Sequence, residues 1–201
     1  TSFGPTSICI SIFGTPNPKG SLLRTGAKVG DGIFVSGTIG DAALGLILRG
    51  SRSLSCLAKE NSYCISRYRI PRPRIDLGLA LGEVASAAMD ISDGLFQDLS
   101  HLCGASNVGG VVHANKIPLS KEVSTFVKEN KFSIEQVITG GDDYELIFTA
   151  PVTKEKSIFN MARVTQTRIT RIGTVQSGGG IFIFDKNGDI VPVSKAGYSH
   201  E

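Results

Sequence analysis

The sequence predicts a mixed α/β fold, and three observations support this prediction. Between residues 77 and 175, segments with the apolar spacing of helices alternate with short segments typical of strands. Near the C-terminus two strand-like segments flank the turn 186–189, whose Asn-Gly pair suits a tight hairpin. The content of 41% hydrophobic and 19% charged residues is that of an ordinary globular protein. We therefore expect helices packed on a sheet that contains antiparallel strands.

The first part of the chain contains two predicted strands and a predicted helix. Residues 7–13 alternate polar and apolar side chains, as a half-buried strand does. A strand at 33–36 leads into the glycine loop 37–41, which begins a helix over 42–48. This order resembles a phosphate-binding loop but lacks the closing Gly-Lys-Ser/Thr. The simpler interpretation is a tight turn in which Asp41 caps the helix.

Prolines at 71 and 73 enforce an extended crossing after a predicted helix at 54–67. We expect a domain boundary at this crossing, with a first unit at 1–70 and a second at 71–201. The second unit is predicted to contain helices at 77–86, 95–102, 121–129, 133–138 and 154–163, and strands at 88–91, 110–114, 144–150, 168–175, 181–184 and 190–193.

The segment Asp90-Ile91-Ser92-Asp93-Gly94 joins a predicted strand to a predicted helix through a glycine turn. Its two carboxylates repel each other unless a cation lies between them, and hard oxygen ligands suit Mg²⁺, which favours phosphates. We expect Ser92 and the backbone N–H groups at the helix start to contact phosphate oxygens. The alternative is that Asp93 only caps the helix and Asp90 is a solvated acid.

A second acidic glycine turn, with the sequence Gly-Gly-Asp-Asp-Tyr-Glu-Leu, occupies residues 140–146. Together with residues 90–94 it resembles the signatures of the thiamine-monophosphate kinase family, within the aminoimidazole ribonucleotide synthetase-like superfamily. Further segments fall in the family's order at 4–5, 23–28, 30–31, 36–43, 71–74, 117–120 and 195–198. The resemblance therefore covers nearly the whole chain.

The resemblance implies phosphorylation of thiamine monophosphate by ATP, with Mg²⁺, to give thiamine diphosphate and ADP. Carried over by position, Asp90 and Asp93 are metal ligands, Arg24 and Ser92 bind ATP, and Glu145 contacts the substrate. Without the resemblance, Arg24 would be a surface arginine and Glu145 a cross-strand acid. The family also implies a homodimer, in which this chain supplies the second half of a first α/β domain and a complete C-terminal α/β sandwich domain.

The chain departs from the family's pattern at both ends. Thr1 falls immediately after a metal-binding Gly-Gly-Asp of the family, so we expect a fragment that is inactive alone. Ser199 and Glu201 stand where the family has an acid and an aromatic residue. Two alternatives remain open: a superfamily enzyme with another phosphate acceptor, and a non-catalytic remnant that serves as an interaction module.

Charge and cysteine usage narrow the class of protein further. The net charge of +3 comes from scattered residues and gives no support to nucleic-acid binding. Cys9, Cys56, Cys64 and Cys103 form no C-x-x-C pair, which favours free thiols and a cytoplasmic location. His101 near Cys103 is the only hint of a soft-metal pair, and a histidine without a metal is the simpler interpretation. We expect no membrane span and no signal peptide.

Overall fold

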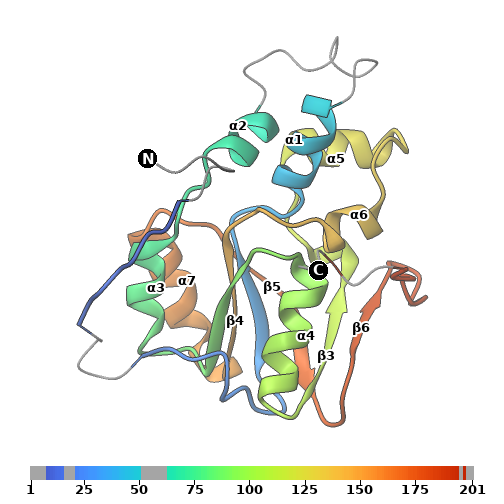
Figure 1. Ribbon diagram of the computed structural model, residues 1–201. Coiled ribbons are helices and arrows are strands. Elements are labelled where there is room, and N and C mark those ends of the chain that lie inside the picture. The colour runs from blue at the N-terminus through green and yellow to red at the C-terminus, as the bar shows by residue number, and fades with distance from the viewer. Residues whose placement is uncertain (1–7, 16–20, 51–62, 195–196, 198–201) are drawn as a thin grey trace.

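A six-stranded sheet organises the computed structural model, which describes residues 8–15, 21–50, 63–194 and 197 (Figure 1). The spatial order of the strands is β2-β4-β1-β5-β3-β6. Every neighbouring pair is antiparallel except β3 and β6, which are parallel. The strands are β1 (Gly32–Ser36), β2 (Ala87–Ile91), β3 (Gly109–His113), β4 (Glu145–Ala150), β5 (Ile169–Gln176) and β6 (Ile181–Phe184). The predicted mixed α/β class is confirmed.

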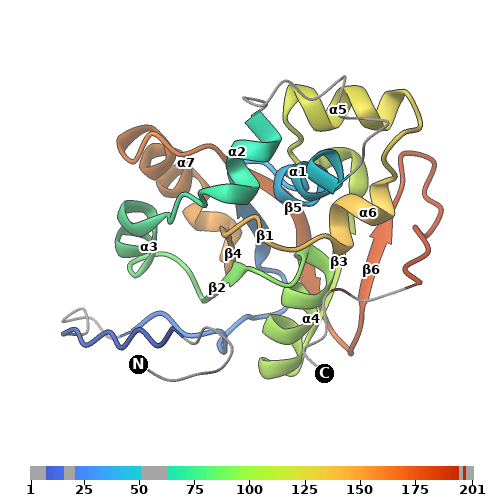
Figure 2. The same cartoon turned by 45° about the horizontal axis from the view of Figure 1, so that its top comes forward.

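Helices cover both faces of this sheet. Helices α3 and α7 lie side by side on one face, whereas α4 covers the other (Figures 1 and 2). The helices are α1 (Asp41–Gly50), α2 (Tyr63–Arg69), α3 (Ile75–Leu81), α4 (Leu95–Ala105), α5 (Lys121–Lys128), α6 (Ile134–Thr139) and α7 (Glu155–Val164), with 3₁₀ turns η1 (Ala114–Lys116) and η2 (Val152–Lys154). Within the described ranges, none of the helices has the length and apolar character needed to cross a bilayer.

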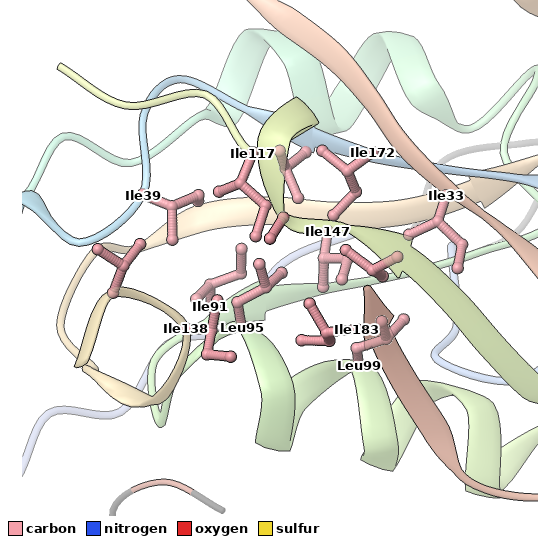
Figure 3. Packing of buried hydrophobic residues seen from close by; sticks show 14 of the residues in the cluster. Ile33, Ile39, Ile91, Leu95, Leu99, Ile117, Ile138, Ile147, Ile172 and Ile183 are labelled. Atoms are coloured by element: carbon pink, nitrogen blue, oxygen red, sulfur yellow. The ribbon is translucent and has the colours of Figure 1, made fainter. Parts of the chain in front are cut away.

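Alternation along the central strands divides the apolar core between the two faces. Ile33 of β1 and Ile147 of β4 point to the α4 side, where Leu95 and Leu99 are fully buried (Figure 3). The two leucines recur at the i, i+4 spacing of one helix face. This larger cluster holds α4, and therefore the turn that precedes it, against the sheet.

The opposite face of the sheet has a smaller core around an aromatic pair. Phe34 and Phe148 are register partners on β1 and β4, and their rings stack with centroids 5.2 Å apart. Leu77 of α3 and Ile158 of α7 belong to the same cluster. Because the two central strands bury both of their faces, they read as nearly continuous apolar runs.

Most predicted elements occur within a few residues of their expected bounds, but three expectations are wrong. Residues 8–13 form no strand, and Ile8, Ile10 and Ile12 are exposed, because no described strand lies beside them. The second hairpin strand is reduced to a bridge between Phe184 and Ile190. The helix expected over 77–86 ends at Leu81, five residues earlier than predicted.

Helix α3 ends early because the chain turns at Gly82. The N–H groups of Val84 and Ala85 both donate to the carbonyl of Leu81, at 2.9 Å from nitrogen to oxygen in each case. The Ser86 N–H then donates to the carbonyl of Thr149, which brings the chain onto the sheet. Of the helix expected at 54–67, residues 63–67 belong to α2 and residues 54–62 lie outside the described residues.

The boundary expected at residues 70/71 does not follow the packing. Strand β1 lies between β4 and β5 and pairs with both. Helix α1 packs against α6, where a Cβ on Gly140 would lie 2.3 Å from the Cβ of Ala43. Residues 32–50 therefore share one sheet and one core with residues 87–184, and a cut at residue 70 would remove a central strand.

Candidate functional site

The two acidic glycine turns lie side by side because β2 and β4 are adjacent antiparallel strands. Ile91, the last residue of β2, is the register partner of Glu145, the first residue of β4. Beyond this pair the Tyr144 N–H donates to the Ile91 carbonyl at 2.8 Å, and the Asp142 N–H donates to the Ser92 carbonyl at 2.9 Å. The structure thus brings together the two motifs that the sequence analysis singled out.

Glycine is required where the two turns touch. Gly94 has a φ of +122°, and a Cβ there would lie 2.8 Å from the Thr139 carbonyl oxygen. A Cβ on Gly141 would lie 2.4 Å from the Ser92 carbonyl oxygen. Real Cβ atoms do not approach a backbone so closely, so these two positions require glycine, which has no side chain.

A pocket of about 770 Å³ opens beside the paired turns. Its apolar lining comes mainly from α1 and Phe132, and much of its polar lining comes from the turns. The lining residues are Ala43, Leu46, Ile47, Tyr68, Ser92, Asp93, Phe132, Gln136, Thr139, Gly140, Gly141, Asp142 and Tyr144. A cavity that combines apolar side chains with convergent polar groups is typical of a small-molecule site.

The hydroxyl group of Tyr144 contacts one carboxylate and feels the negative charge of two more. Its Oη lies 3.5 Å from Oδ1 of Asp142. Burial raises the pKa of Tyr144, and the negative charges of Asp142, Asp90 and Asp93 raise it further. Asp90 is exposed, whereas Asp93 and Asp142 are half-buried. This edge of the pocket is therefore negative and favours a cation.

The backbone of the second turn is unusual at two non-glycine positions. Asp142 has a φ of +69° and Tyr144 a φ of +49°, in the left-handed region that side chains rarely adopt. Such conformations cost free energy and concentrate at functional sites. As a result Asp142 and Tyr144 line the pocket, while Asp143 and Glu145 between and beyond them are buried. The sequence analysis did not single out Asp142 or Tyr144 individually.

Asp98 of α4 holds the first turn from the interior. Its Oδ2 accepts three hydrogen bonds, from the N–H groups of Ser92 at 2.9 Å, Asp93 at 3.1 Å and Gly94 at 3.2 Å. Burial raises the pKa of Asp98 to about 6, although these N–H groups act in the opposite direction. A carboxylate therefore already occupies the N–H groups of Ser92, Asp93 and Gly94. Contact of phosphate oxygens with the N–H groups in the first turn of α4 stays a prediction.

The N-cap residue of α4 is Gly94, the residue after Asp93. That the Asp93 side chain caps the helix stays a prediction. Asp93 and Ser92 line the pocket, whereas Asp90, the penultimate residue of β2, is not among its lining residues. The assignment of Asp90 and Asp93 to a metal and of Ser92 to ATP stays a prediction that this placement favours.

Glu145 is the centre of a buried ion cluster. Arg67 donates from Nη2 to Oε1 at 2.9 Å, and Arg74 donates from Nε to Oε2 at 2.7 Å. The Ser36 hydroxyl also donates to Oε2, at 2.6 Å. The glutamate is fully buried and does not line the pocket, so the structure assigns it a structural role. A direct contact between Glu145 and a substrate stays a prediction.

Arg24 lies away from the paired turns. Its neighbour Leu23 accepts a hydrogen bond from Ala88 near the start of β2, at 2.9 Å from nitrogen to oxygen. Ser92 follows the opposite end of that strand, and the Arg24 side chain is exposed. Within the described residues the structure does not bring the two predicted ATP contacts together.

Asp143 caps α1 from a distant part of the chain. Its carboxylate accepts the N–H groups of Gly40 at 2.6 Å and Ala42 at 3.1 Å. Burial raises the pKa of Asp143 to about 7. Asp41, the predicted cap, instead accepts a hydrogen bond from the Thr38 hydroxyl and is itself buried with a raised pKa. Because Asp143 is far from α1 in the sequence, no local pattern around residues 40–42 indicates that it caps this helix.

The acids at the pocket edge suit a hydrated ion better than a closed metal cage. In the part of the chain that the structure describes, no three His, Cys, Asp or Glu side chains are placed to share one metal. Mg²⁺ commonly keeps several waters and binds through one or two carboxylates together with phosphate oxygens. Asp93 and Asp142, which both line the pocket, fit that mode.

The soft-metal hint at His101 finds no support. His101 is exposed on α4, whereas Cys103 is buried in the core. Burial raises the pKa of the Cys103 thiol to about 11, so the thiolate that binds a metal is disfavoured. Cys9, Cys64 and Cys103 are free thiols, and Cys56 lies outside the described residues.

The fold and the paired turns agree with a sequence family. The chain belongs to the family described as AIR synthase related protein, C-terminal domain, whose sequence model matches residues 28–186. The thiamine-monophosphate kinase of Escherichia coli (strain K12) is 35% identical over 200 residues, which cover 100% of this chain and 61% of that protein.

Solved structures agree with these relatives. The thiamine-monophosphate kinase from Stenotrophomonas maltophilia K279a superposes with a TM-score of 0.75 at 33% identity, covering 87% of this chain and 55% of the other. A structure described as "AaThiL complexed with AMPPCP and TMP" has a TM-score of 0.71 at 36% identity, covering 90% and 54%. The chain spans about three fifths of the length of the curated relatives.

We predict that Glu145→Ala destabilises the fold without any ligand present. The substitution leaves Arg67, which is 3% exposed, as a buried charge without its carboxylate. The free energy of unfolding should fall by about 3–5 kcal/mol, as measured by urea denaturation of the chain. Glu155→Ala is the matched control, because its partner Arg171 is 3.8 Å away and half-exposed, and it should cost less than about 1 kcal/mol. Equal losses would contradict the structural role of Glu145.

Asp143 should make stability depend on pH. Its carboxyl group keeps its proton up to about pH 7 in the folded chain but releases it near 3.8 when unfolded. The folded state therefore binds more protons between these values, and the free energy of unfolding falls as the pH rises through them. Asp143→Asn should make this fall shallower, as measured by urea denaturation across the range. Asp185 is the control, because backbone hydrogen bonds lower the pKa of its carboxyl group, and Asp185→Asn should leave the fall in the free energy of unfolding unchanged. The same fall in Asp143→Asn as in the wild type would refute the assignment.

Proposed function

We propose that the protein containing this chain transfers a phosphoryl group from ATP to thiamine monophosphate. The observation that carries the proposal is the acidic pocket formed by the turns at 90–94 and 140–144, in a chain 34–35% identical to thiamine-monophosphate kinases. A structural neighbour, 36% identical, is complexed with AMPPCP and TMP, which supports an ATP analogue and thiamine monophosphate as the chemical classes of ligand.

The chemistry of the pocket suits an acceptor that carries both charges. Thiamine monophosphate combines a cationic thiazolium ring with an anionic phosphate. Asp142 and the aromatic side chains of Tyr68 and Tyr144 lie in the same cavity and suit the cation. The acceptor phosphate is already ionised near neutral pH, so the residues need to position it rather than deprotonate it. No strong general base is required of this chain.

We propose that Asp93 holds Mg²⁺ with Asp90, and that Ser92 contacts the nucleotide. When bound, the metal supplies the positive charge that offsets repulsion between two phosphate groups. The residues of this chain contribute orientation: the turn fixes Asp93 at the pocket edge, and the apolar wall from α1 limits the water around the substrate. Binding of ATP by Arg24 and contact of Glu145 with the substrate in the whole protein stay predictions.

The organisation of the whole protein is also a proposal. We propose that the domain boundary lies before residue 28, because β1 belongs to the described sheet and the family match begins at that residue. Free thiols at Cys9, Cys64 and Cys103 support a cytoplasmic location. The homodimer implied by the family resemblance stays a prediction.

The test is turnover by the longest natural protein that contains this chain. We expect thiamine diphosphate and ADP from thiamine monophosphate and Mg²⁺-ATP, and Asp93→Asn should lower kcat by on the order of 100-fold, because the metal is no longer held. Asp76→Asn, an exposed acid on α3, is the matched control and should leave the rate unchanged. Absence of thiamine diphosphate would reject the substrate, and an unchanged rate for Asp93→Asn at saturating Mg²⁺ would reject the role of Asp93.

A further inference from the structure

Asp98 is a charged residue on the apolar face of α4. It is 1% exposed and shares the buried side of the helix with Leu95, Leu99 and Leu102. A carboxylate in such a place is costly unless hydrogen bonds compensate for the lost water. Its Oδ1 has no hydrogen-bond partner among the described residues, so Oδ2 alone makes the compensating bonds.

The compensating bonds form an anion site made of backbone. Successive N–H groups of Ser92, Asp93 and Gly94 converge on Oδ2 at 2.9, 3.1 and 3.2 Å. Converging N–H groups of this kind bind phosphates in many proteins, and here the chain's own carboxylate fills the place. An incoming phosphate therefore meets the side chains of this turn and not its N–H groups.

The opposite side of the same turn is fixed by the second glycine turn. The Ser92 carbonyl accepts the N–H of Asp142 at 2.9 Å, and Gly94 lies against the carbonyl of Thr139. The peptide groups on either side of Ser92 and Asp93 are thus held from two directions. Without Asp98 the three N–H groups would lose the acceptor that holds them on this side.

We infer that Asp98 is the positioning residue of the candidate site: its buried carboxylate locks the Ser92–Gly94 turn so that Asp93 faces the pocket and can hold a divalent cation there. The part about the cation rests on the proposed function, whereas the locking of the turn does not. Asp98 touches neither the pocket nor a substrate, so it acts only through the turn.

Two variants and one control test this inference. Asp98→Asn keeps the shape but loses the charge that strengthens the three bonds, and Asp98→Ala removes the acceptor. Asp31→Asn is the control, because Asp31 is also a buried acid that accepts a backbone N–H, from Lys28 at 3.0 Å, at the other end of the sheet. Hydrogen exchange of single amides, measured by NMR, reports how firmly the turn is held. Calorimetric titration with Mn²⁺ reports the affinity for a divalent cation.

In both Asp98 variants the amides of Ser92, Asp93 and Gly94 should exchange at least about tenfold faster than in the wild type, while those of β4 keep their protection. The dissociation constant for Mn²⁺ should rise at least about tenfold. Asp31→Asn should change neither quantity. Unchanged exchange at the three amides, or a Mn²⁺ affinity within about twofold of wild type in folded Asp98→Asn, would overturn the inference.

The two proposals fail in different ways. If the wild-type protein binds no Mn²⁺ and makes no thiamine diphosphate, the proposed function is rejected, and the amide exchange rates still decide whether Asp98 locks the turn. If thiamine diphosphate forms at the wild-type rate in Asp98→Asn, the function stands and the positioning role is overturned. Should Asp98→Ala fail to fold, the isosteric Asp98→Asn carries the comparison.

Discussion

The backbone contact between the two glycine turns is the constraint on which the candidate site depends. The Asp142 N–H binds the Ser92 carbonyl, and Gly141 lies so close to that carbonyl that a Cβ would be 2.4 Å from it. This contact extends the pairing of β2 with β4 beyond the sheet. It leaves the side chains of Asp93 and Asp142 along one edge of the same pocket. Helices and strands farther away serve to keep the two turns at this distance.

The acidic residues around the site form two sets with different roles. Asp98, Asp143 and Glu145 are buried, and each binds backbone N–H groups or arginines of a neighbouring segment. They determine where the turns lie. Asp93 and Asp142 are accessible from the pocket and determine its charge. Because alternate residues of the 142–145 segment belong to different sets, one short stretch both anchors the site and supplies its polar edge.

Local patterns in the sequence were sufficient to predict most helices and strands and the two acidic turns. Apolar spacing and glycine positions determine the structure of only a few neighbouring residues, so they can be read from a short stretch of sequence. The assignment of Asp98 was missed although a signal exists: it is a charged residue at a position of α4 that the helical period places with Leu95 and Leu99. Contacts such as Asp143 with Gly40 were out of reach, because they depend on tertiary packing. The central position of β1 in the sheet was missed for the same reason, because the sequence of a strand does not determine which strands lie beside it.

The most direct test of this account is to locate a cation by anomalous scattering in crystals of the natural protein grown with Mn²⁺ and an ATP analogue. The paired turns predict a Mn²⁺ peak within coordination distance of the Asp93 carboxylate, at the edge of the pocket that also holds Asp142. A site bound by Asp98 or Glu145 would contradict the division between anchoring and pocket acids. A well-occupied site elsewhere with none at Asp93 would contradict the central claim that the two turns form one cation-binding edge.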